Sequence, residues 1–150
     1  MKDYACERIY RDARITSIYE GTTQLQVVAA IRHVTTGTYA QLMEQYAAED
    51  VKPELQAVKD RIASLVEAYK AAVEKVTSVD NNAYADFMAR RLVEMAGGIV
   101  MSYLLLSDAN RCADFTKSLN VYVNLVAAEV ARHTEFINSF EVAALDNYLA

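Results

Sequence analysis

The sequence predicts an all-α protein in which an N-terminal helix-loop-helix hairpin precedes an antiparallel up-down helical bundle. Glycine and proline, which most often interrupt regular structure, occur only four times and once, so long helices are expected. Apolar residues also recur at intervals of three and four through most of the chain, which is the helical period. The length of 150 residues allows one domain with a proper core but not two sizeable ones.

The hairpin begins with a helix over about residues 2–14, where polar and apolar residues alternate at helical spacing. The β-branched stretch 15–19 is expected to be extended, and residues 20–21 to form a turn. A threonine then caps a second helix over about residues 23–35.

A threonine-rich linker around Gly37 separates this hairpin from the rest of the chain. Glycine is favoured just after a helix C-terminus, where the backbone is often left-handed. We therefore expect residues 1–36 to form the end of one domain and residues 38–150 an appended helical bundle. A weaker helix over about 39–48 should pack against that bundle.

Three long helices are expected in the bundle, joined by short turns so that they run up, down and up. The first, about residues 53–76, is strongly amphipathic and starts at the only proline. The second, about 83–108, should be the most buried because its second half is apolar on all sides. The third covers about 115–140, and the tail 141–150 could add a helical turn.

Two details within the bundle carry expectations of their own. Gly97 and Gly98 lie inside the second long helix, where each would lower helix propensity by about 1 kcal/mol. Close approach of another helix, or a local kink, would explain them. Asp114 is a candidate cap for the last helix.

Composition excludes several classes of function. The net charge of −5 and the absence of a basic cluster argue against a nucleic-acid surface. Cys6 and Cys112 have no metal-like spacing, so we expect reduced thiols, no metal site and a cytoplasmic protein. The N-terminus lacks the apolar core of a signal peptide. The longest uncharged run, residues 95–107, is shorter than a membrane span and fits a buried helix.

Glu20 is the residue most suggestive of chemistry. Ile18 and Tyr19 precede it, Gly21 follows, and a helix start comes next. A helix start offers free backbone N–H groups to an anion. A carboxylate covered by apolar neighbours would have a raised pKa, as a general base near neutrality requires. The alternative, a solvated surface glutamate, stays open on these grounds alone.

The same region resembles the C-terminal signature and catalytic loop of the acyl-CoA dehydrogenase flavoenzymes. An acidic, a basic and another acidic residue recur at the family's spacing, at Asp3, Arg8 and Asp12. Residues 19–22 read Y-E-G-T, as in the family. Further matches follow in the next helix at Gln24, Gln26 and Arg32. The resemblance covers about the first 36 residues.

The resemblance implies roles for these residues. Glu20 would be the base that removes the pro-R α-hydrogen of an acyl-CoA thioester, while the β-hydrogen leaves as hydride to FAD. Its backbone N–H would bind the thioester oxygen. Tyr19 and Gly21 would line the acyl site. Three residues would contact FAD: Thr22, Thr23 and Gln24.

The match also implies what this chain lacks. The opening of the signature, Q-x-x-G-G-x-G, and the two N-terminal domains of the family would precede Met1, and Val27 replaces a common arginine. We therefore expect the C-terminal part of a parent enzyme that uses FAD and an electron-transfer flavoprotein or similar acceptor. The isolated chain should hold no FAD, be inactive and form a homo-oligomer.

A different class of function remains open, a helical oligomerisation or interaction module without enzyme activity. His133 does not decide between them. It lies on an apolar stripe with Glu129 one turn earlier, so a partnered core or interface histidine is favoured over a metal ligand or catalytic group.

Overall fold

The computed structural model describes residues 6–16 and 23–148, and the side chain of Gln24 is not described. All regular structure in these ranges is helical, and they contain no strand. The predicted all-α class is therefore confirmed. The sequence predicts no membrane span. By length and composition alone, one helix among the described residues, Asn82–Arg111, could cross a membrane, but it forms the core of the bundle.

Three short helices precede the bundle: α1 (Cys6–Ile15), α2 (Thr23–Thr35) and α3 (Thr38–Ala47). Gly37 joins α2 to α3 with φ 77°, in the left-handed region that glycine adopts without strain. Its N–H donates to the carbonyl of Val34 at 3.1 Å, and its carbonyl accepts from Gln41 at 3.0 Å. The glycine therefore has the position after a helix that the sequence predicts. Ile15, expected to begin an extended stretch, is instead the last residue of α1.

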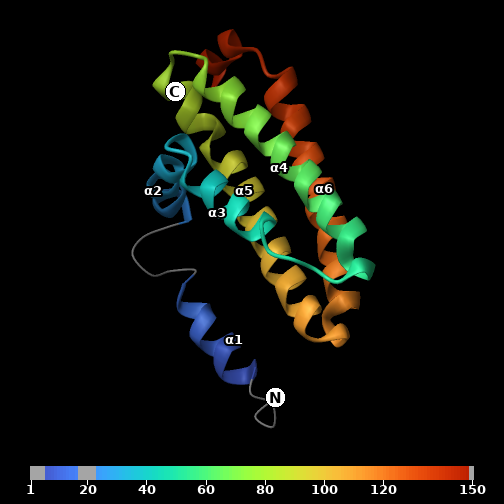
Figure 1. Cartoon of the computed structure of the whole chain (residues 1–150). Coiled ribbons are helices and arrows are strands. Elements are labelled where there is room, and N and C mark those ends of the chain that lie inside the picture. The colour runs from blue at the N-terminus through green and yellow to red at the C-terminus, as the bar shows by residue number, and fades with distance from the viewer. Residues whose placement is uncertain (1–5, 17–22, 149–150) are drawn as a thin grey trace.

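Three long antiparallel helices form the bundle: α4 (Gln56–Thr77), α5 (Asn82–Arg111) and α6 (Thr116–Ser139). Each packs against the other two, as Figure 1 shows. Short 3₁₀ helices flank them at Pro53–Leu55, Ala113–Phe115 and Val142–Asn147. The predicted up-down-up order and the helical tail are both found.

The N-termini of α5 and α6 are capped in different ways. Asn81 accepts a hydrogen bond from the N–H of Tyr84 at 3.0 Å and so caps α5. The prediction that Asp114 caps α6 is wrong. Asp114 lies inside the 3₁₀ turn before α6, and the N-cap residue, Phe115, makes no side-chain cap bond. The 3₁₀ turn provides the backbone partners that a cap would otherwise supply.

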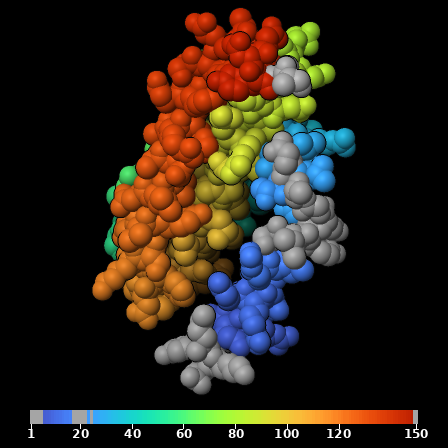
Figure 2. All heavy atoms as spheres, turned by 180° about the vertical axis from the view of Figure 1, so that it is seen from behind, coloured from blue at the N-terminus to red at the C-terminus, as the bar shows by residue number. Residues whose placement is uncertain are grey.

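Helix α5 is the centre of the molecule. Its buried residues run from Tyr84 to Ala109, and α2, α3, α4 and α6 all contact it. On the face shown in Figure 2, α5 lies between α6 and α2. Burial on so many sides explains the apolar composition that predicted the most buried helix.

The two glycines of α5 have different surroundings. A Cβ on Gly98 would lie 3.1 Å from Cγ1 of Val126, whereas a Cβ on Gly97 would meet nothing within 4 Å. Gly98 therefore permits the close approach of α6 that the sequence suggested. Gly97 has no such role.

Alanine substitutions at these two positions should have different effects on the free energy of unfolding. We expect Gly97→Ala to raise the free energy of unfolding by about 0.5–1 kcal/mol, because it removes unfolded-state freedom without a clash. Gly98→Ala should lie at least about 1 kcal/mol below it, because Val126 must move. Urea unfolding of both variants measures the difference. Equal gains at the two sites would contradict the packing described.

Helices α1 and α2 relate differently to the bundle. α2 covers α5 with Val27 and Val34, which are 6% and 1% exposed, and with the half-buried Ile31. α1 has no buried residue, and Figure 1 shows it apart from the other helices. The division of the chain at Gly37 stays a prediction.

Candidate functional site

The predicted catalytic loop lies between α1 and α2. Four of its predicted site residues fall outside the part of the chain that the structure describes: Tyr19, Glu20, Gly21 and Thr22. The described residues fix the two ends of the loop, at Thr16 and Thr23. Across this gap, the side-chain amide of Gln26 donates to the carbonyl of Thr16 at 3.4 Å. The contact is long, but it brings the two ends of the loop together.

The remaining predicted site residues, Thr23 and Gln24, begin α2. Thr23 is exposed. The first N–H groups of a helix have no partner within it, and they carry the positive end of the helix dipole. The start of α2 can therefore offer a hydroxyl and backbone donors to a polar or anionic group of a ligand.

Two charged residues of the signature, Arg8 and Asp12, lie on α1, and Asp3 lies outside the described residues. The guanidinium of Arg8 is 3.8 Å from the carboxylate of Asp12, and that of Arg11 is 2.8 Å from Glu7. These are pairs between successive helical turns, and the Arg8–Asp12 pair is largely exposed to solvent. Pairs of this kind contribute little to stability, so they do not by themselves explain the charge pattern.

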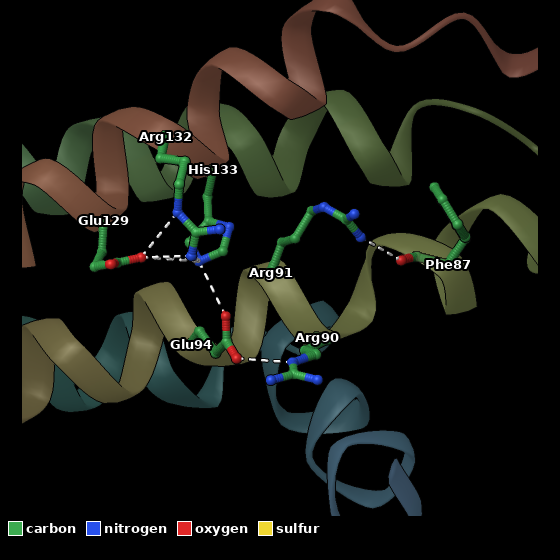
Figure 3. Close-up of polar contacts among 7 residues, drawn as sticks. All are labelled: Phe87, Arg90, Arg91, Glu94, Glu129, Arg132 and His133. Atoms are coloured by element: carbon green, nitrogen blue, oxygen red, sulfur yellow. Dashed lines mark hydrogen bonds and ion pairs between the residues drawn. The ribbon is translucent and has the colours of Figure 1, made fainter. Parts of the chain in front are cut away.

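A second polar cluster joins α5 to α6 (Figure 3). Nε2 of the buried His133 lies 3.0 Å from Oε2 of Glu94 on α5 and 3.9 Å from Oε2 of Glu129 on its own helix. The other carboxylate oxygen of Glu94 accepts from Nε of Arg90 at 2.8 Å. Arg132 binds Glu129 through two nitrogens.

Arg91 lies at one edge of the cluster. Its guanidinium lies 3.8 Å from the ring centroid of Phe136 and donates to the carbonyl of Phe87 at 2.9 Å. The ring faces offset part of the desolvation of the guanidinium. Burial lowers the pKa of Arg91, but an arginine this basic stays charged.

The surroundings of His133 and Glu94, at the centre of the cluster, shift the pKa of both residues. Burial lowers the pKa of His133 and Arg132 adds to this, while Glu94 and Glu129 oppose it. Partial burial raises the pKa of Glu94, but the hydrogen bond from Arg90 and the neighbouring cations outweigh it, so the net shift is downward. Glu94 is therefore ionised and His133 tends to be neutral near neutrality.

Stability should fall as the pH drops through the histidine range. The folded-state pKa of His133 lies below its unfolded value of about 6.5, so the unfolded chain takes up the proton first. We expect the free energy of unfolding to decrease from about pH 7 until the folded-state pKa is passed. Urea unfolding between about pH 5 and 8 measures this slope.

Two histidine variants make that prediction specific. His133→Gln should flatten the slope, whereas His33→Gln, which changes an exposed side chain, should leave it unchanged. An unaltered slope in His133→Gln would show that other groups cause the dependence.

The cluster borders a surface cavity of about 410 Å³. Its floor is apolar and includes Met95, Gly98 and Val126. No serine, threonine, cysteine or lysine is among the residues that line it beside the Glu94–His133 pair. Within the described residues, no group of three His, Cys, Asp or Glu side chains could hold a metal ion. The geometry supports a structural link between α5 and α6.

The expectation that His133 is a partnered core histidine is confirmed. Its closer partner, however, is Glu94 rather than Glu129. Sequence spacing pairs residues within one helix, so it could indicate Glu129 but not a carboxylate on another helix. Arg90 and Glu94, one turn apart on α5, also form an ion pair.

Two protein-family models match the chain in succession. "Acyl-CoA dehydrogenase, C-terminal domain" matches residues 1–35, and "Acyl-CoA dehydrogenase C terminal" matches residues 35–145. The first contains the predicted loop, and the second contains the bundle.

Two curated proteins are similar over short segments of the chain. Acryloyl-CoA reductase (NADH) from Anaerotignum propionicum is 59% identical over 34 residues, which are 23% of this chain and 9% of that protein. An acyl-CoA dehydrogenase from Bacillus subtilis is 47% identical over 38 residues, 25% of this chain and 10% of that protein. The matched segment therefore spans only about a tenth of each of these relatives.

A solved structure resembles most of the chain. The crystal structure of an acyl-CoA dehydrogenase family protein from Porphyromonas gingivalis has a TM-score of 0.72 and 39% sequence identity. The match covers 75% of this chain and 98% of that one. Nearly all of the shorter chain thus consists of the matched fold.

Proposed function

Because the chain belongs to the acyl-CoA dehydrogenase family, whose models match residues 1–35 and 35–145, we propose that it is the C-terminal part of an FAD-dependent acyl-CoA dehydrogenase. The reaction would convert an acyl-CoA thioester to the 2-enoyl-CoA. The observation that carries the proposal is the Y-E-G-T loop at residues 19–22, inside the residues 1–35 that match the model of the acyl-CoA dehydrogenase C-terminal domain.

Glu20 is the proposed base. Its carboxylate would accept the pro-R α-hydrogen as a proton, and its backbone N–H would donate to the thioester oxygen, which stabilises the negative charge that develops there. Tyr19 and Gly21 would border the acyl chain. The relative named as a reductase fits the same arrangement, because a group that removes the α-proton in one direction returns it in the other.

The start of α2 fits one edge of a flavin site. Thr23 is exposed there, and the first N–H groups of a helix have no partner within the helix, so they can bind an anionic group. When FAD is bound, it supplies an acceptor for the β-hydrogen as hydride. Thr22, Thr23 and Gln24 would hold it by polar contacts. Electrons would then pass to an electron-transfer flavoprotein or a similar acceptor in the cytoplasm.

The isolated 150-residue chain should be colourless and inactive. It supplies only one wall of the proposed site, and its matched segment spans about a tenth of the curated relatives. Absorbance spectra of the purified chain, with and without added FAD, and dye reduction with several acyl-CoA esters test this. A flavin spectrum that persists through gel filtration, or dye reduction that depends on acyl-CoA, would contradict it.

A second candidate function rests on exposed apolar surface. Large apolar side chains are uncovered on four helices: Ile9, Tyr10 and Ile15 on α1, Leu25 and Val28 on α2, Met101 and Leu104 on α5, and Val121 and Leu125 on α6. Where such side chains lie together they mark interaction sites. We propose that the chain also associates through this surface, as a homo-oligomer, a role compatible with membership in a larger enzyme.

A further inference from the structure

A second cavity of about 410 Å³ lies between α5 and α6 and shares Arg132 and His133 with the first. Arg91 on α5 also lines it, and in Figure 3 this side chain extends from α5 while Arg132 and His133 extend from α6 into the space between the helices. The other lining residues are Glu135, Phe136 and Ser139. A volume of this size suits a small organic molecule.

Arg91 brings to this cavity a charge that no carboxylate neutralises directly. Its guanidinium is half-buried, donates to the carbonyl of Phe87 and lies over the rings of Phe87 and Phe136. None of the carboxylates that the structure describes forms an ion pair with it. Removing a cation from water costs free energy that a paired anion recovers. The surroundings of Arg91 therefore favour an anion in the cavity.

Arg132 supplies a second guanidinium to the same cavity. It binds Glu129 through Nε and one terminal nitrogen, so within the described part of the chain its other terminal nitrogen has a free pair of N–H donors. The two guanidinium groups are close enough for the charge of Arg132 to lower the pKa of Arg91. An anion between them would relieve this repulsion and accept hydrogen bonds from both.

The other charges around the cavity decide which anion fits. Glu135 lines it and opposes a highly charged anion. Glu94 and Glu129 are each paired with an arginine, Arg90 and Arg132. The charged lining residues, two arginines and one glutamate, therefore leave a small excess of positive charge. A ligand with a single negative charge and an apolar part matches this balance.

We propose that this cavity binds a small organic carboxylate. The carboxylate would lie between the guanidinium groups of Arg91 and Arg132, and the apolar part would pack against the half-buried ring of Phe136. His133 would border the ligand, because it lines the same cavity. The proposal uses no residue of the predicted catalytic loop and goes beyond the proposed enzymatic role.

NMR of the two histidines tests the site with benzoate as the probe. His133 lines the cavity, whereas His33 is exposed on α2 and does not. Titration of the full chain at low ionic strength should shift the ring signals of His133 with a Kd of about 1–10 mM and leave those of His33 unchanged. Benzamide, which has the same ring but no charge, should bind at least tenfold more weakly.

Three results of these titrations would overturn the proposal. They are no shift of His133 up to about 50 mM benzoate, equal shifts of both histidines, and equal binding of benzoate and benzamide.

Arginine variants test the two contacts separately. Arg132→Gln and Arg91→Gln should each weaken benzoate binding at least tenfold with unchanged helix content. Arg91→Lys keeps the charge without the planar fork, so it should weaken binding less, and it replaces Arg91→Gln if that variant unfolds. Two controls should bind as the unmodified chain or more tightly: Arg111→Gln, at the far end of α5, and Glu129→Gln, which removes the partner of Arg132. Unchanged affinity in either glutamine variant of the cavity arginines, or an equal loss in Arg111→Gln, would contradict the site.

Discussion

Replacing Glu20 by glutamine in the FAD-loaded parent enzyme should lower kcat for acyl-CoA oxidation by about 10²–10⁴-fold. Glutamine has nearly the same shape but cannot take the α-proton. Because the backbone N–H is unchanged, binding of the thioester oxygen should persist. The flavin absorbance per protein should stay at the unmodified level, which separates loss of a base from loss of the site.

A matched carboxylate controls for charge. Glu49 is exposed in the loop after α3 and lies in the bundle segment of the chain, so Glu49→Gln should keep full activity. If Glu20→Gln loses FAD together with activity, the residue has a structural role and the proposed base lies elsewhere.

Removing residues 1–37 should leave a bundle that still unfolds cooperatively but is less stable by about 3 kcal/mol or more. The apolar stripes of α4, α5 and α6 bury one another. The free energy of unfolding falls because the deletion uncovers α5: it removes Val27 and Val34, the two buried valines of α2.

A shorter deletion separates the contributions of α1 and α2. A chain that begins at residue 17 lacks only α1, whose residues are not buried. Its thermal midpoint at low concentration should equal that of the full chain. A chain of residues 38–150 that melts without a cooperative transition would refute the proposed boundary at Gly37.

The sequence predicted most of the fold because the signals are local. Gly37, Pro53 and Asn81 each act through their own backbone or side chain, so helix starts and ends could be placed to within a few residues. Asp114 failed because a 3₁₀ turn competes with a side-chain cap, and sequence alone does not show which one forms.

The sequence predicts some features of the candidate sites and not others. The Glu20 loop was predicted from a short run of residues that resembles the family, and because it lies outside the described residues it stays a prediction. The Glu94–His133 contact could not be predicted, because it depends on the packing of α5 against α6.

The most direct test of the central claim is exchange of the α-hydrogen. In the FAD-loaded parent enzyme, a bound acyl-CoA analogue that cannot lose its β-hydrogen should exchange its α-hydrogen with D₂O, as followed by mass spectrometry. We predict rapid exchange in the unmodified enzyme and at least a 100-fold slower rate in Glu20→Gln, with FAD bound in both. Equal exchange in the two proteins would contradict the assignment of Glu20 as the base.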